Sequence, residues 1–226
     1  VVNSASFSAD GRRILTCDSE SNVRIWDSDS GNILLELDEE AEDVALCSFS
    51  PDASTIVTSV GGEVIRILDS GTGQLIASLV GHTALIMSAR YSADGKRLVT
   101  ASIDGSARKW DVETGQQLAE FKVAQDGLRA AFLIAEDSEL LAIEYNGTAT
   151  VWNVESGTKT QEFGHFIPFA QDVEVSPDGS WLLVANYQYR PSLWDLSTTA
   201  RFIDGAMAIP HVLGAAFSDD GTRVAL

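Results

Sequence analysis

Short runs of apolar and β-branched residues alternate with polar residues along the whole chain, and each run is bounded by Gly, Asp, Ser or Pro. An alternation of period two, rather than 3.6, predicts strands joined by tight turns. Four kinds of run follow one another in a fixed order, as in VNSASF from Val2, RILTC from Arg13, NVRIW from Asn22 and GNILLEL from Gly31. No segment has a helical period, so the sequence predicts an all-β protein.

Two independent markers indicate that this four-strand unit repeats every 42 residues. The Ser that opens an acidic turn recurs as Ser8, Ser50, Ser92, Ser176 and Ser218, and the residue that ends the third run recurs as Trp26, Leu68, Trp110, Trp152 and Trp194. A fixed period of this length is typical of repeat folds in which one unit buries its apolar faces only against its neighbours.

The period divides the chain into approximate units 1–42, 43–84, 85–126, 127–168 and 169–210, with a partial unit at 211–226. Four antiparallel strands that stack radially on neighbouring units protect their edges from pairing with other chains. The sequence therefore predicts a β-propeller of four-stranded antiparallel blades, with five full blades and half of a sixth.

The stretch YSADGKRLVTASIDGSARKWDVETGQQLAEF from Tyr91, with the preceding Gly81-His82, resembles a WD40 repeat, in particular the bacterial type of WD40 array. The resemblance implies one propeller over residues 1–226. Its rings most often have seven blades, less often six or eight, and six or seven repeats would need 26 or 68 more residues. We therefore expect the chain to be an excerpt of a longer propeller.

The same resemblance implies a buried polar relay within a blade. Only one blade, taken with the Gly-His pair that precedes it, has all its parts, which are His82, Thr100 or Ser102, Asp104 and Trp110. The positions that correspond to Asp104 hold Glu20, Gly62, Asn146 and Gln188, and a second pair, Gly164-His165, is out of register by one residue. A catalytic reading of His82 and Asp104 is disfavoured because no nucleophile follows the same pattern.

Composition and charge narrow the function classes. The formal net charge of −18 would repel a phosphate backbone, so we expect no nucleic-acid partner. No apolar run approaches the length of a membrane span, and the first residues do not resemble a signal peptide. The two cysteines, Cys17 and Cys47, show no pairing pattern, which favours a reducing, cytoplasmic setting.

Candidate metal and cofactor sites are weak. Asp27–Gly31, DSDSG, resembles the start of a calcium loop but lacks its later Glu, and it matches the ordinary turns at Asp69, Asp111 and Asn153. The three histidines, His82, His165 and His211, do not follow the repeat. We expect no metal, no cofactor and no enzyme activity, because no nucleotide-binding or nucleophile motif occurs.

Two segments stand out as candidate partner-binding loops on the face that carries the links between strands two and three and between blades. One is acidic and contains Glu39, Glu40, Glu42 and Asp43. The other combines aromatic and apolar residues with an arginine, namely Phe166, Ile167, Phe169, Tyr187, Tyr189 and Arg190. Solvated or packed loops remain the alternative reading of both segments.

The sequence therefore predicts a non-enzymatic protein-interaction scaffold or the sensor region of a larger regulatory protein. Its partner would be a protein, and the acidic surface favours a basic one. Two alternatives stay open. One is a propeller that binds a small molecule or a metal, with enzyme activity in some cases. The other is a structural module that self-associates through the open strand edge of its last half-blade.

Overall fold

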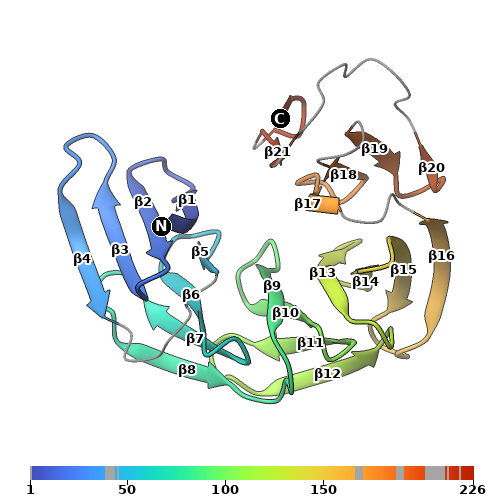
Figure 1. Ribbon diagram of the computed structural model, residues 1–226, viewed down its shortest axis with the longest axis horizontal. Coiled ribbons are helices and arrows are strands. Elements are labelled where there is room, and N and C mark those ends of the chain that lie inside the picture. Colours follow the sequence, from blue (N-terminus) through green and yellow to red (C-terminus); the bar gives the residue numbers. More distant parts are fainter. Residues whose placement is uncertain are drawn as a thin grey trace. The chain divides into compact units, whose positions relative to one another are not determined.

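The computed structural model describes residues 2–38, 44, 46–165, 170–186, 191–201, 212, 214–218 and 220–226. The chain divides into two compact units, Val1–Ala131 and Phe132–Leu226. The described residues form strands and turns without any helix, as Figure 1 shows. Accordingly, no helix that could cross a membrane occurs among them.

The first unit contains three four-stranded antiparallel sheets in which sequential strands are neighbours. The first sheet is β1 (Val2–Phe7), β2 (Arg13–Asp18), β3 (Asn22–Asp27) and β4 (Ile33–Asp38). The second is β5 (Cys47–Phe49), β6 (Thr55–Val60), β7 (Val64–Asp69) and β8 (Leu75–Leu79). The third is β9 (Ile86–Tyr91), β10 (Arg97–Ser102), β11 (Ser106–Asp111) and β12 (Gln117–Lys122).

Further sheets repeat the same order later in the chain. The fourth sheet is β13 (Leu128–Ile134), β14 (Glu139–Glu144), β15 (Thr148–Asn153) and β16 (Lys159–His165). The fifth is β17 (Ala170–Val175), β18 (Trp181–Asn186), β19 (Ser192–Asp195) and β20 (Ala200–Arg201), and the two-stranded one is β21 (Ala216–Phe217) and β22 (Val224–Ala225). The prediction of an all-β chain built of four-stranded antiparallel units is confirmed.

Two strands are shorter than their sequence runs predicted. The run from Val44 gives only Cys47–Phe49. At Leu46 the N–H donates to the hydroxyl of Ser59 at 3.1 Å, and the carbonyl accepts the N–H of Ser59 at 3.1 Å. The run from Val212 gives only Ala216–Phe217, and the N–H of Ala215 donates to the Asp172 carboxylate at 3.1 Å. In both cases a side chain accepts the N–H of the residue directly before the strand.

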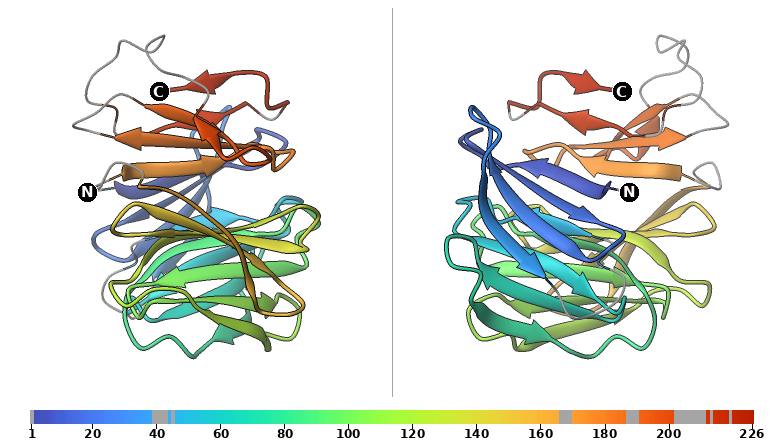
Figure 2. Two further views of the ribbon diagram at one scale, coloured as in Figure 1. Left: turned by 90° about the vertical axis from the view of Figure 1, so that its right-hand side faces the viewer. Right: turned by 60° about the vertical axis from the view of Figure 1, so that its left-hand side comes forward.

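The core lies between the flat faces of successive sheets, which stack against one another within the first unit (Figure 2). The layer between the first and second sheets contains Leu15, Cys17, Val23, Ile25, Val44, Cys47, Ile56 and Leu68. The layer between the second and third sheets contains Val57, Ile65, Ile67, Leu79, Ile86, Ala89, Leu98, Trp110 and Val112. The second sheet contributes to both layers, which explains why its strand β6 is buried on both sides.

A repeated serine closes the turn between the first two strands of a sheet. The hydroxyl of Ser8 donates to the Asp10 carboxylate at 2.6 Å and accepts the N–H of Arg13 at 3.0 Å. The same donation to an aspartate recurs at Ser50, Ser92, Ser176 and Ser218. In the fourth sheet Ile134 replaces the serine, and the turn there places Ala135, Glu136 and Asp137 at positive φ.

Candidate functional site

Four side chains of the third sheet and its preceding loop form one hydrogen-bonded chain. The indole N–H of Trp110 on β11 donates to Thr100 Oγ1 on β10 at 2.9 Å. His82 Nε2 lies 2.7 Å from the same Thr100 oxygen, and His82 Nδ1 lies 2.8 Å from Asp104 Oδ2. The structure therefore brings together the relay residues that the WD40 resemblance suggested.

The direction of these bonds defines the state of His82. Since the Thr100 oxygen accepts from Trp110, its hydroxyl proton is available for His82 Nε2, and His82 Nδ1 then carries the proton that it donates to Asp104. Burial lowers the pKa of His82, and this effect exceeds the opposing hydrogen bond to Asp104. His82 is accordingly a neutral, fully paired imidazole at neutral pH.

Asp104 ties the relay to the surrounding loops. Its Oδ1 accepts the N–H and the hydroxyl of Ser106 at 2.9 and 2.6 Å, and its Oδ2 accepts from His82 and from the N–H of Thr83. Burial by itself would raise the pKa of Asp104, but these hydrogen bonds outweigh it and hold the pKa below the ordinary value. Asp104 is thus an ionised carboxylate with both oxygens occupied, which suits a structural role.

Thr100, and not Ser102, supplies the hydroxyl of the relay. The hydroxyl of Ser102 donates to the carbonyl of Ala84 at 2.9 Å and accepts the N–H of Asp104 at 3.0 Å. Ser102 therefore joins the loop before β9 to the turn after β10. The sequence alone left Thr100 and Ser102 as alternatives for the relay hydroxyl.

Two glycines give the relay its space. A side chain at Gly81 would meet the guanidinium of Arg108 and the ring of Trp110, so the residue before His82 must be small. Gly105 has φ of 83°, and a Cβ there would collide with the carbonyl oxygen of Ala124.

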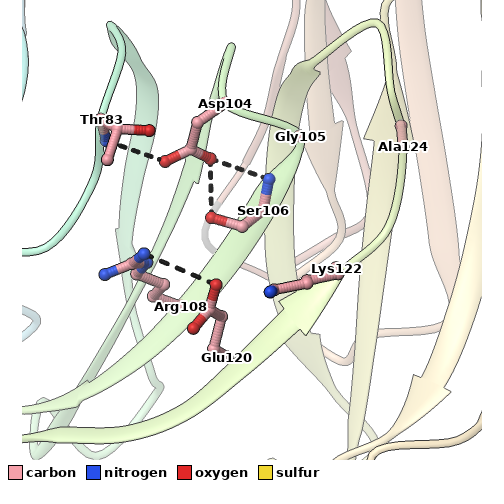
Figure 3. Close-up of a pocket in the computed structure, with 8 residues that line it drawn as sticks. All are labelled: Thr83, Asp104, Gly105, Ser106, Arg108, Glu120, Lys122 and Ala124. Carbon is pink, nitrogen blue, oxygen red and sulfur yellow. Dashed lines mark hydrogen bonds and ion pairs between the residues drawn. The ribbon is translucent and has the colours of Figure 1, made fainter.

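A pocket of about 380 Å³ opens beside this relay on the third sheet (Figure 3). Its loop residues are Thr83, Asp104, Gly105 and Ala124, and its strand residues are Ser106, Arg108, Glu120 and Lys122. In Figure 3 the side chains of Arg108, Glu120 and Lys122 gather on β11 and β12, below Thr83 and Asp104. The pocket is therefore charged and polar, and it belongs to one sheet.

The charged groups of the pocket are only partly paired. Arg108 Nη2 lies 3.5 Å from Glu120 Oε1, and Arg108 Nη1 donates to Gln117 at 3.0 Å. Arg108 Nε is buried and has no hydrogen-bond partner among the described residues. At the corresponding position of the first sheet, Arg24 pairs with Glu36 at 2.6 Å, so the third sheet holds its Arg–Glu pair more loosely.

Two apolar side chains lie exposed on the same loops. Leu85 is 51% exposed and Ile103 is 38% exposed, and the N–H of Ile103 donates to the carbonyl of Leu85 at 2.9 Å. The side chain of Leu85 lies over Gly62, and the backbone of Ile103 lies beside Gly127. We call these two residues, with the pocket residues, the β9–β12 docking edge. Sequence reasoning missed it, although apolar residues in the loop stretches HTALI and SID gave a signal.

The partner-binding loops predicted from the sequence lie outside the described residues. This holds for the acidic residues Glu39, Glu40, Glu42 and Asp43 and for the aromatic group Phe166, Ile167, Phe169, Tyr187, Tyr189 and Arg190. Their role stays a prediction.

The described residues of the candidate metal sites do not form a set of metal ligands. Asp27 Oδ1 accepts the N–H and the hydroxyl of Ser30 at 2.8 and 2.6 Å, so DSDSG forms a turn stabilised by its own aspartate. His211 lies outside the described residues. Within the described ranges, no group of three or more His, Cys, Asp or Glu side chains could hold a metal ion.

A family model agrees with this architecture. The model for WD40, described as WD domain, G-beta repeat, matches residues 1–27 and 73–111. The first match covers β1 to β3, and the second runs from the turn before β8 to the end of β11 and includes the relay. No curated protein matches the chain.

Proposed function

We propose that the chain is a protein-interaction scaffold of the WD40 type whose partner docks on the β9–β12 docking edge. The WD40 model matches residues 1–27 and 73–111, and the described strands form the four-stranded antiparallel sheets of such repeats, which supports this proposal. WD40 domains generally bind protein partners. The present proposal assigns the contact to particular residues of one blade and gives the chain no catalytic step.

This assignment rests on the pocket of about 380 Å³ together with the exposed side chains of Leu85 and Ile103, which lie on the same loops as the pocket residues Thr83 and Asp104. Protein interfaces commonly combine an apolar centre with polar groups at its rim. Leu85 and Ile103 would supply the apolar contact, and the loosely held pair of Arg108 and Glu120 would supply the polar one. Lys122 adds a third charged group on the same side.

Charge supports a basic partner. The net charge of −18 attracts cationic proteins over a range set by the ionic strength, and it speeds their encounter more than it tightens the final complex. Lysine or arginine side chains of the partner would then compete with Arg108 for the Glu120 carboxylate. The acidic residues Glu39, Glu40, Glu42 and Asp43 would add to the attraction.

A capture experiment with matched surface variants tests the docking edge. The chain is immobilised and exposed to an extract of its source cells, in parallel with the double variant Leu85→Asp, Ile103→Asp and with Leu75→Asp. Leu75 is a fair control because it is 56% exposed at the start of β8, whereas the loop that carries Leu85 follows the other end of that strand. We expect the double variant to lose about tenfold or more of the captured partner, as hot-spot residues do, and the control to retain it.

Salt and folding complete the test. Capture by the unaltered chain should weaken as sodium chloride is raised, because attraction between exposed charges is screened. All three proteins should melt at similar temperatures. Equal capture by the double variant and the control, or capture that salt does not affect, would contradict the proposal.

We also propose that the chain serves as the sensor region of a larger regulatory protein in a reducing cytoplasm. Two buried free thiols are consistent with that compartment. The coding sequence on either side of the segment tests the idea directly. A nucleotide-binding or kinase domain there would support it, and a secretion signal upstream would contradict it.

The volume of the pocket favours one second candidate, which is the binding of a small polar ligand. A thermal-shift screen of amino acids and other zwitterions separates this function from scaffolding. A ligand that raises the melting temperature of the unaltered chain, but not that of Lys122→Ala, would support the small-ligand function.

A further inference from the structure

The two cysteines of the chain lie on neighbouring sheets of the first unit. Cys17 is on β2 of the first sheet and Cys47 begins β5 of the second. Both are free thiols, 0% and 4% exposed, and both belong to the apolar layer that joins these two sheets. Neither contributes to the relay or to the docking edge.

Backbone register, one hydrogen bond and a shared apolar layer place the two cysteines on facing sides of the first two sheets. Ser4 on β1 is the direct cross-strand partner of Cys17, so the two side chains project from the same face of the first sheet. The hydroxyl of Ser4 donates to the carbonyl of Cys47 at 3.3 Å. The face that carries Cys17 is therefore the face that contacts β5 at Cys47.

The protonation of the two thiols is unequal. The hydrogen bond between the two side chains, together with burial, raises the pKa of Cys47. The same hydrogen bond lowers the pKa of Cys17 and exceeds the opposing effect of burial. We assign the first reaction to Cys17 because its thiol is the one whose pKa is lowered.

We propose that Cys17 and Cys47 are an oxidation site at which hydrogen peroxide forms a disulfide that links the first sheet to the second. In the first step the Cys17 sulfur attacks one peroxide oxygen, the O–O bond breaks, and Cys17 becomes a sulfenic acid while water leaves. In the second step the Cys47 sulfur attacks the Cys17 sulfur and the S–O bond breaks. A second water leaves with the proton of Cys47, so two thiols and one peroxide give one disulfide and two waters.

Burial selects the oxidant. A small, neutral peroxide can reach a side chain that is shielded by the sheets, whereas a larger disulfide reagent must wait for the sheets to separate. Once Cys17 is a sulfenic acid, Cys47 is already in contact with it and can resolve it before further oxidation. The pair thus resembles a reactive thiol with its resolving partner rather than two inert core residues.

The disulfide would change the region that surrounds it. It would close a covalent ring from Cys17 to Cys47, and that ring contains β3, β4 and the acidic residues Glu39, Glu40, Glu42 and Asp43. Closing a ring of this length removes conformational freedom from the unfolded chain and stabilises the folded one. The redox state would therefore set the stability of the contact between the first two sheets.

Peptide mapping of the intact chain tests the proposal. The purified protein is treated with hydrogen peroxide, denatured in an alkylating agent and digested. We expect a peptide that joins Cys17 to Cys47, a chain mass lower by two hydrogens, and no alkylated cysteine. The melting temperature should rise by roughly 5 to 10 °C and return to its starting value after reduction.

Two single variants serve as controls. In Cys47→Ala and in Cys17→Ala, peroxide should convert the remaining cysteine to a sulfenic acid that a dimedone probe traps. Neither variant should gain stability on oxidation. Disulfides between chains, both cysteines ending as sulfinic acids, or two thiols that stay free while a cysteine-containing control peptide is oxidised would each overturn the proposal. The mapping uses the unaltered chain, so it does not depend on the folding of the variants.

Discussion

Trp152 donates its indole N–H to Thr150, two residues earlier on the same strand, at 3.0 Å. In the third sheet Trp110 makes the corresponding bond across strands, to Thr100. The difference follows from the sequence, because Ala142 occupies in β14 the position that Thr100 occupies in β10. In the fourth sheet the acceptor hydroxyl is therefore on β15 instead of β14, and the indole N–H of Trp152 still has a hydrogen-bond acceptor. The fifth sheet does the same, where Trp194 donates to Ser192 at 3.0 Å.

The first prediction concerns this exchange. Thr150→Val should lower the free energy of unfolding by about 1 kcal/mol, because the indole of Trp152 loses its acceptor. Adding Ala142→Thr should recover most of the loss, since the new hydroxyl faces Trp152 from the neighbouring strand as Thr100 faces Trp110. Denaturant unfolding of the single and double variants measures both effects. A double variant that is no more stable than the single one would refute the exchange.

The second prediction concerns Asp104. Asp104→Ala should lower the free energy of unfolding by roughly 1 to 3 kcal/mol, because His82 Nδ1 loses its acceptor inside the blade. Glu20 occupies the same repeat position in the first sheet, is exposed and has no histidine beside it, so Glu20→Ala should change stability by less than about 0.5 kcal/mol. Equal changes in chemical unfolding for both variants would show that the relay does not stabilise the blade.

The third prediction concerns Thr58. Leu68 stands in the second sheet where Trp110 stands in the third, and the buried hydroxyl of Thr58 has no hydrogen-bond partner among the described residues. Thr58→Val should therefore raise the free energy of unfolding by about 1 kcal/mol, whereas Thr100→Val should lower it by roughly 1 to 3 kcal/mol. Thermal melting of the two variants decides the matter, and a loss of stability in both would contradict the assignment.

The fourth prediction is the pH dependence that His82 confers. The pKa of His82 is lower in the folded chain than in the unfolded one. At a pH between these two pKa values, His82 is therefore protonated in the unfolded chain and neutral in the folded chain. The contribution of His82 is full above the unfolded pKa of about 6.5 and declines as the pH falls from there towards the folded pKa. The limiting slope is about 1.4 kcal/mol per pH unit.

Unfolding measured between pH 7.5 and 5 in the chain and in His82→Gln isolates this contribution. The difference in stability between the two proteins should shrink as the pH is lowered. A difference that grows towards acid would mean that the folded chain holds His82 in its protonated form.

The fifth prediction separates backbone conformation from close packing. Gly105 and Gly11 both have positive φ, but only Gly105 has a backbone oxygen in the space of a Cβ. Gly11→Ala should cost about 1 kcal/mol from its backbone conformation alone. Gly105→Ala should cost roughly 1 to 3 kcal/mol more, because the loop backbone at Ala124 must shift. Similar losses in the two variants would show that the loops are free to adjust.

The sequence by itself determined the strands and their order. Alternating apolar residues and turn residues are local signals, and they recur at a constant spacing, so even the short link from Ser92 to Asp94 was visible as a turn. The relay residues His82, Asp104 and Trp110 also followed from a family resemblance, since their positions relative to the strands repeat with the fold. What these signals share is that the residues of each lie close together in the sequence.

Only the tertiary structure decided which groups from different strands or repeats meet. Thr100 and Ser102 are equivalent in sequence terms, and the register of β10 against β11 alone sends Thr100 to Trp110. Cys17 and Cys47 show no pattern along the chain, yet stacking of the first two sheets puts them in contact. Leu85 and Ile103 are exposed although both are apolar, and only the structure shows that Leu85 lies over Gly62. Side-chain contacts between strands arise from packing in three dimensions, which a one-dimensional period does not encode.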